Sequence, residues 1–134
     1  MQVIVEHLGA VQFEIKARQH TIISDQPIDS GGDDEGMTPP ELLLASLGSC
    51  AAFYAVDYLK RNGLLRDGVK VRATAEKVKG PFRVDNFKIE VEVPGGIEEK
   101  HMKGLDDAVH RCLIHNTLLH PPKIELVIQS PVAA

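Results

Sequence analysis

The stretch from Thr38 to Gly63 constrains the fold more than any other part of the sequence, because it predicts one long helix that is apolar on every side. No charged residue occurs between Leu42 and Val56. A helix with no polar face must be enclosed. Its apolar run is shorter than a membrane span of roughly 20 residues, and serine and glycine interrupt it. We therefore predict a buried core helix.

Both ends of this helix carry recognisable signals. Thr38 and Glu41 have the S/T-x-x-E spacing of a capping box, in which each side chain bonds to the other residue's backbone N–H. Pro39 would occupy the first helical position, where its missing N–H costs nothing. Gly63 is placed to end the helix, so the last helical residue is expected near Asn62.

The rest of the chain predicts strands, a second helix and a loop. A Gly- and Asp-rich segment, residues 25–37, has the composition of a mobile acidic loop. Helical periodicity predicts a second helix from Glu98 to about Leu113. Alternating polar and apolar residues predict strands at residues 2–6, 11–16, 21–24, 69–79, 82–93 and 123–129. The order βββ-α-ββ-α-β joins strands by hairpins, which predicts a largely antiparallel sheet and an α+β class.

The length of the chain predicts one domain over residues 1–134, since a single core typically occupies about 100 to 150 residues. One small sheet cannot enclose a helix that is apolar all round. The sheet of a second subunit would complete the cover. We therefore predict a homodimer with the two long helices buried at its centre.

Composition excludes several classes of partner. The net charge is −4, and the chain has four Phe, two Tyr and no Trp, so neither a basic surface nor stacking residues favour nucleic-acid binding. The first residues alternate polar and apolar and lack a basic segment followed by an apolar run, so we expect no secretory signal. A cytoplasmic protein with no membrane partner is expected.

Two cysteines, Cys50 and Cys112, are the candidate reactive residues. In the cytoplasm such a pair is expected to be free, reactive or transiently bonded. Peroxide reduction requires a thiolate, access for the oxidant, a nearby cation and a second thiol that resolves the sulfenic acid. The two residues meet the thiol requirement. The alternative is that each is a small buried apolar residue, and Cys112 does fall on the apolar stripe of the second helix.

Activation of Cys50 must come from outside its helix, because the helix dipole acts only within the first turn and Cys50 lies much deeper. Arg18 is preferred, since the early turn that carries it can fold over the helix. His20 and His115 are the alternatives. Cys112 and His115 form a C-x-x-H half-site without a second paired motif, so we predict no metal and no cofactor.

Three segments carry a resemblance to a known family. They are G-M-T-P-P-E-L-L-L-A-S-L-G-S-C at residues 36–50, C-L-I-H-N-T-L at residues 112–118 and the P-P-K-I-E-L that follows. Together they resemble the OsmC/Ohr family, and the P-x-E-L-L-L and C-x-x-H-N-T-L forms are similar to a branch apart from its characterised peroxidases. Those peroxidases place a glutamate where this sequence has Pro40.

The resemblance implies an intertwined homodimer in which Cys50 reduces organic hydroperoxides and Cys112 forms a disulfide with it. It also implies that a dithiol, such as a lipoylated protein, regenerates the pair. Our hypothesis is a cysteine-based hydroperoxide reductase. Its apolar substrate site would be lined by Leu43, Leu47, Phe53 and Tyr54. The alternatives are a non-catalytic protein of the same fold that binds a small apolar ligand or partner, and a thiol redox sensor.

Overall fold

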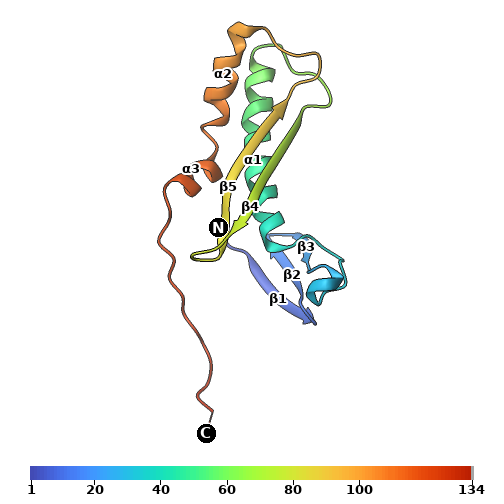
Figure 1. Cartoon of the computed structure of the whole chain (residues 1–134), viewed down its shortest axis with the longest axis vertical. Helices are drawn as coiled ribbons and strands as arrows, with labels where there is room; N and C mark the ends of the chain where they lie inside the picture. Colours follow the sequence, from blue (N-terminus) through green and yellow to red (C-terminus); the bar gives the residue numbers. More distant parts are fainter. Residues whose placement is uncertain (134) are drawn as a thin grey trace.

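The computed structural model describes residues 1–133 and shows an α+β chain built around one long helix (Figure 1). Its elements are β1 (Ile4–Gly9), β2 (Gln12–Ala17), β3 (His20–Ser24), η1 (Ile28–Ser30), α1 (Pro39–Arg61), β4 (Lys70–Val78), β5 (Arg83–Glu92), α2 (Glu99–Val109) and α3 (Leu113–Leu119). The predicted class, the order of the first seven main elements and the antiparallel pairing are confirmed.

The strands form two separate antiparallel sheets. The first has the order β1-β2-β3, and the second is the β4-β5 hairpin. In the first sheet, Val5 of β1 pairs with Ile15 of β2. In the second, Ala73 of β4 pairs with Ile89 of β5. The β4-β5 hairpin lies along α1, whereas the three-stranded sheet lies near the end where α1 begins (Figure 1). The two sheets therefore occupy different parts of the molecule.

The capping box forms as the sequence predicts. The Glu41 N–H donates to Thr38 Oγ1 at 3.4 Å, and the Thr38 N–H donates to Glu41 Oε2 at 2.7 Å. Pro39 follows at the first helical position. The helix ends at Arg61, one residue before the predicted end, and Gly63 has a φ of 67°. The ends of α1 are thus set by local sequence.

One chain covers only a stripe of α1. The fully buried residues recur at every fourth position, which places them on one face: Leu47, Ala51, Ala55 and Leu59. That face packs against β4, α2, α3 and β5. The helix is long and apolar enough to cross a membrane by length and composition, but this packing makes it a core helix. Phe53, on another side, remains 66% exposed.

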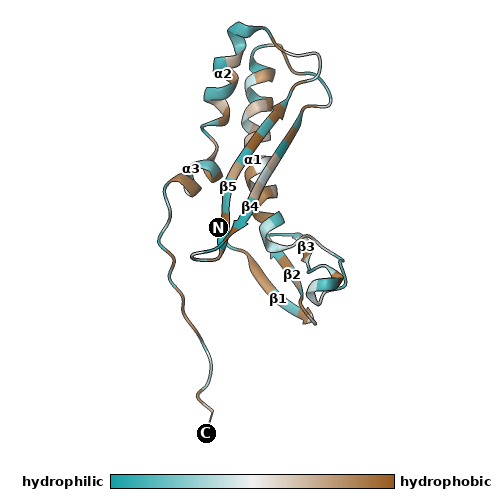
Figure 2. Ribbon diagram, in the orientation of Figure 1, coloured by the Kyte–Doolittle hydropathy of each residue, from teal (hydrophilic) through white to brown (hydrophobic). Residues whose placement is uncertain are grey.

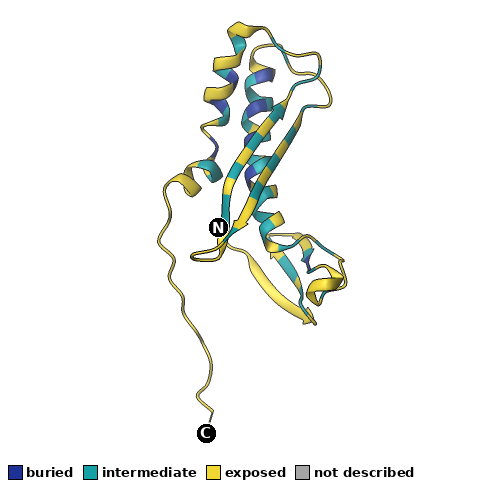
Figure 3. Ribbon diagram, in the orientation of Figure 1, coloured by how far each residue is buried: buried dark blue, intermediate teal, exposed yellow. Residues whose placement is uncertain are grey.

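The segment after α3 differs from the prediction. Most of the expected connector is helix α3, and residues 121–133 run extended and form no strand within the chain (Figure 1). Apolar residues remain prominent along this segment (Figure 2). Ile124, Leu126 and Ile128 are 83% to 89% exposed. Figure 3 shows the whole segment in the colour of exposed residues. A strand needs a neighbouring edge for its N–H and C=O groups, and residues 1–133 of one chain supply none here.

The acidic loop is held together by one buried carboxylate. Asp25 is 1% exposed, and its oxygens accept three backbone N–H bonds, at 2.7, 3.2 and 3.1 Å, from Gln26, Asp33 and Glu35. The two ends of the loop meet where Ser24 pairs with Met37. The expected mobility of this segment is therefore replaced by a defined conformation that includes η1.

Candidate functional site

The structure brings Cys50 and Cys112 together from distant parts of the sequence. Cys50 lies in the middle of α1 and is half-buried, whereas Cys112 is fully buried at the residue that precedes α3. Because α1 packs against α3, the two cysteine side chains are neighbours. Both are free in this structure. A buried thiol thus lies beside a partly accessible one.

The surroundings of Cys112 favour its neutral form. Burial raises the pKa of the Cys112 thiol, and the neighbouring Cys50 thiol raises this pKa further. The backbone N–H groups of His115 and Ile114 act in the opposite direction, and the first of these lies 3.4 Å from Sγ. The balance keeps Cys112 protonated at neutral pH. Cys50 is half-buried and so is the thiol that an oxidant can reach, whereas Cys112 is fully buried and protonated.

Arg18 lies apart from the cysteines within one chain. It occupies the tight turn between β2 and β3, has a φ of 56° and is exposed. His20, at the start of β3, is exposed on the same sheet. The elements that pack on α1 are β4, β5, α2 and α3, none of which carries Arg18. A single chain therefore brings neither basic residue to Cys50.

A cavity of about 860 Å³ lies between α1, β5, α2 and α3. Of the four predicted substrate contacts, only Leu47 lines it. Leu43 and Tyr54 are half-buried, and the exposed Phe53 packs edge-on against Tyr54 with ring centres 5.2 Å apart. Most of the cavity wall comes from β5, α2 and α3, and the apolar residues that these elements contribute are Val84, Phe87, Ile89, Val91, Met102, Leu105, Val109, Leu118 and Leu119. Sequence reasoning did not identify these residues as a wall.

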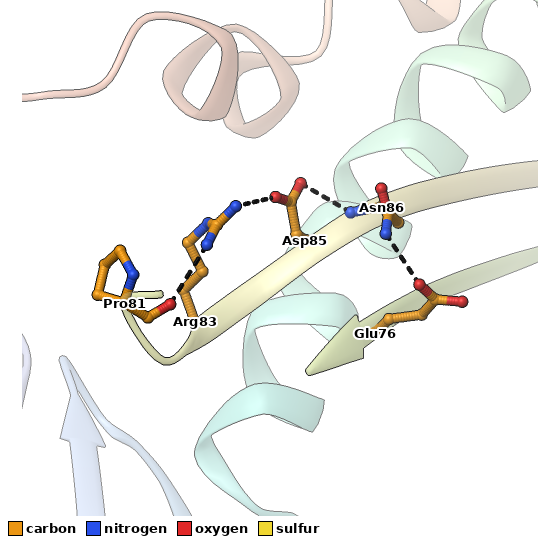
Figure 4. A network of polar contacts seen from close by, with 5 residues as sticks. All are labelled: Glu76, Pro81, Arg83, Asp85 and Asn86. Carbon is orange, nitrogen blue, oxygen red and sulfur yellow. Dashed lines mark hydrogen bonds and ion pairs between the residues drawn. The ribbon is translucent and has the colours of Figure 1, made fainter. Parts of the chain in front are cut away.

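One rim of this cavity carries a polar network on the β4-β5 hairpin (Figure 4). Arg83 donates to Asp85 at 2.7 Å and to the Pro81 carbonyl at 3.2 Å. The Asn86 N–H donates to Asp85 at 2.8 Å, and its side chain donates to Glu76 at 2.8 Å. The Asn86 N–H and then Arg83 lower the pKa of Asp85. The only sequence signal for the Arg83–Asp85 pair was its i, i+2 spacing, which places both side chains on one face of the strand.

Two histidines line the same cavity beside Cys112. The rings of His110 and His115 have centres 5.3 Å apart, and His110 Nδ1 lies 3.3 Å from the Asp106 carboxylate. His115 Nδ1 is buried and has no hydrogen-bond partner among the described residues. Across residues 1–133, no three His, Cys, Asp or Glu side chains gather in a geometry suited to a metal ion.

Fold and site together define a class: α+β proteins with one long central helix, antiparallel hairpins and two thiols that meet where that helix contacts a short one. The sequence model for the OsmC-like protein family matches residues 32–127, well over half of the chain. The chain therefore belongs to the OsmC-like protein family. This confirms the family expected from the cysteine motifs.

Solved structures agree with this family at the level of fold. A Psychrobacter arcticus protein described as an osmotic stress induced and detoxification response protein has a TM-score of 0.78 and 22% identity over 87% of each chain. An OsmC-like protein from Mycoplasma pneumoniae has a TM-score of 0.72 and 20% identity over 90% of this chain and 87% of that one. For an organic hydroperoxide resistance protein OsmC from Legionella pneumophila the values are 0.60 and 17%, over 88% and 89%. No curated protein sequence matches the chain significantly.

Proposed function

We propose that this protein reduces organic hydroperoxides with Cys50 as the peroxidatic residue and Cys112 as the resolving residue. The observation that carries the proposal is the pairing of a half-buried and a fully buried thiol at the contact of α1 and α3. Family membership supports it, since some structural neighbours are named organic hydroperoxide resistance proteins. The neighbouring cavity, largely apolar, suits an organic rather than a small polar peroxide.

The chemistry uses each thiol once. The Cys50 thiolate attacks the distal oxygen of the hydroperoxide, the O–O bond breaks, and Cys50 sulfenic acid and an alcohol result. Cys112 then attacks the Cys50 sulfur, which forms the disulfide and releases water. An external dithiol, such as a lipoylated protein, returns two electrons and restores both thiols. No resident cofactor takes part in this scheme.

We propose that the working unit is a homodimer. One chain leaves a face of α1 uncovered and several apolar side chains of the C-terminal segment exposed, and a second copy would cover both. Arg18 is the proposed cation, and it would reach Cys50 across this interface because its own sheet does not pack on α1. Pro40 stands where the family's peroxidases have a glutamate, so Arg18 would be oriented by other groups.

We further propose one domain over residues 1–134, of which residue 134 lies outside the described residues. We also propose a cytoplasmic location, where free thiols persist.

The decisive experiment on the peroxidase activity is to mix the reduced protein with cumene hydroperoxide and count free thiols. Both thiols should be lost within seconds, and the Cys50→Ser variant should lose neither. Cys112→Ser should oxidise once and then stop turning over. Unchanged thiols in the wild-type protein would contradict the proposal.

The cavity of about 860 Å³ favours a second candidate, a binding protein of the same fold for a small apolar ligand or partner. Under that function, cumene hydroperoxide would leave the thiols intact, whereas an apolar fluorescent probe would bind and Leu105→Glu, in the cavity wall, would abolish its binding. A thiol redox sensor would instead form the disulfide but turn over slowly with dithiols. The thiol count and the turnover rate together separate these functions.

A further inference from the structure

Helix α3 contributes no fully buried residue to the core. None of the residues from Leu113 to Leu119 is buried, whereas Cys112, which precedes them, is 0% exposed. A helix of seven residues gains little from its own hydrogen bonds, because helices shorter than about 12 residues are marginal in water. Its first turn holds no acidic residue, and its last turn holds no basic one. The stability of α3 therefore depends on how Cys112 holds its beginning.

The sulfur of Cys112 caps α3. The His115 N–H donates to Cys112 Sγ at 3.4 Å, and the Ile114 N–H acts on the same sulfur. Both N–H groups belong to the first turn, where a helix offers them no partner of its own. The Cys112 side chain is also the neighbour of Cys50 on α1. One sulfur atom thus serves as the cap of α3 and as a member of the thiol pair.

We propose that oxidation of the thiol pair releases this cap and loosens α3, which gives the reductant access to the disulfide. The proposal rests on the proposed function, in which Cys50 and Cys112 form that disulfide. In the reaction the two thiols lose two electrons and two protons, and one S–S bond replaces two S–H bonds. The O–O bond of the hydroperoxide breaks, and the hydroperoxide becomes an alcohol and water.

The cap and the disulfide draw the Cys112 sulfur toward different elements. The N–H donors belong to α3, whereas Cys50 belongs to α1. Atoms in van der Waals contact lie more than about 3.5 Å apart, and a disulfide holds its sulfurs at about 2.05 Å. Leu47 and Ala51, near Cys50 on α1, are fully buried and keep this part of the helix in place. The movement therefore falls on Cys112, and its sulfur leaves the N–H groups of α3.

A loosened α3 serves the second half of the reaction cycle. Reduction requires a dithiol to attack one sulfur of the disulfide, and Cys112 is fully buried in the closed structure. Helix α3 packs on α1, and its residues His115, Leu118 and Leu119 form part of the wall of the large cavity. Movement of α3 would uncover the disulfide and open the cavity so that the alcohol can leave. The protein would then be closed while reduced and open while oxidised.

The test is hydrogen exchange of α3, followed by mass spectrometry. The disulfide is made with diamide, an azo compound that takes two hydrogen atoms from a pair of thiols, so the test requires no peroxide. We expect the amides of residues 116–120 to exchange about fivefold faster in the oxidised protein, which is the factor expected for the loss of one helix cap. Amides of the β4-β5 hairpin should not change. Cys50→Ser, treated in the same way, cannot form the disulfide and should exchange like the reduced wild type.

Two variants isolate the cap in the reduced protein. Cys112→Ala removes the acceptor and should exchange at α3 as fast as the oxidised wild type. Cys112→Ser supplies a hydroxyl group at the same position and should keep the exchange slow. If Cys112→Ala fails to fold, as judged by circular dichroism, the comparison of oxidised with reduced wild type decides.

Exchange at α3 that does not accelerate on oxidation would overturn the proposal. Equal exchange for Cys112→Ala and Cys112→Ser would also overturn it, as would failure of diamide to form the disulfide. The peroxide assay remains separate. A wild-type protein that ignores cumene hydroperoxide, but whose α3 loosens after diamide treatment, would contradict the proposed peroxidase activity alone.

Discussion

Asp25 shows how one residue can determine the conformation of a whole loop. Its carboxylate is buried, yet backbone N–H bonds, first that of Gln26, hold its pKa below the usual range despite the opposing effect of burial. The ionised carboxylate is thus the form that the folded loop requires. Because the folded pKa lies below the unfolded one, its stabilisation is present above about pH 4 and is lost as the pH falls through the folded pKa.

We therefore expect Asp25→Asn to lower the free energy of unfolding at pH 7, since the amide replaces a charged acceptor of three N–H bonds. The difference from the wild type should shrink as the pH falls below about 4, where the wild-type carboxylate also becomes protonated. Urea unfolding at fixed protein concentration measures both. Asp29→Asn, on the exposed η1 turn of the same loop, is the control and should change little. A difference that does not vary with pH would contradict this account.

The candidate cysteines could be predicted from the sequence, because each lies in a family motif and the two share one chemical requirement. The cavity wall could not. Alternation shows that β5 has two faces, but it does not show which face meets α2 and α3. The unpartnered nitrogen of His115 was equally hidden, since C-x-x-H spacing says nothing of what surrounds the ring. Both features depend on tertiary packing.

At the scale of elements, α1 begins where a local signal places it. The capping box satisfies two backbone N–H groups, one at Thr38 and one at Glu41. This explains why the predicted and observed starts of α1 agree. α3 carried no such signal, because Cys112 precedes it and cysteine is not a usual capping residue. The sequence therefore predicted a connector there.

Thr38→Ala should reduce the free energy of unfolding by about 1 kcal/mol, because the Glu41 N–H loses its acceptor. Thr38→Ser keeps the hydroxyl and should stay close to the wild type. Chemical denaturation followed by far-UV circular dichroism gives both values. Equal losses for the two variants would show that the threonine methyl group, rather than the cap, is responsible.

At the scale of the whole molecule, the C-terminal segment is the part that one chain leaves unsatisfied. Its alternation of apolar and polar residues predicted a strand, and the extended conformation preserves that alternation. Sequence alone could not say which edge the strand pairs with. In the proposed dimer that edge belongs to the second copy, so Ile124, Leu126 and Ile128 would become buried on association.

We expect Leu126→Lys to weaken the dimer at least tenfold. Burial of a leucine contributes about 1.5 to 3 kcal/mol, and about 1.4 kcal/mol corresponds to a factor of ten in Kd. Gln129→Lys introduces the same charge on the opposite face of the predicted strand and is the control. Analytical ultracentrifugation over a range of concentrations gives both constants. An unchanged Kd for Leu126→Lys would exclude this segment from the interface.

The extended C-terminal segment also has a consequence for biosynthesis. If its hydrogen-bonding edge is supplied only by another copy, the last stage of maturation is a bimolecular encounter, and its rate scales with the abundance of newly made chains. Until that encounter, each nascent molecule displays a strand with open edges, which is a template for aggregation. Scarce expression would therefore prolong the vulnerable interval, and abundant expression would shorten it.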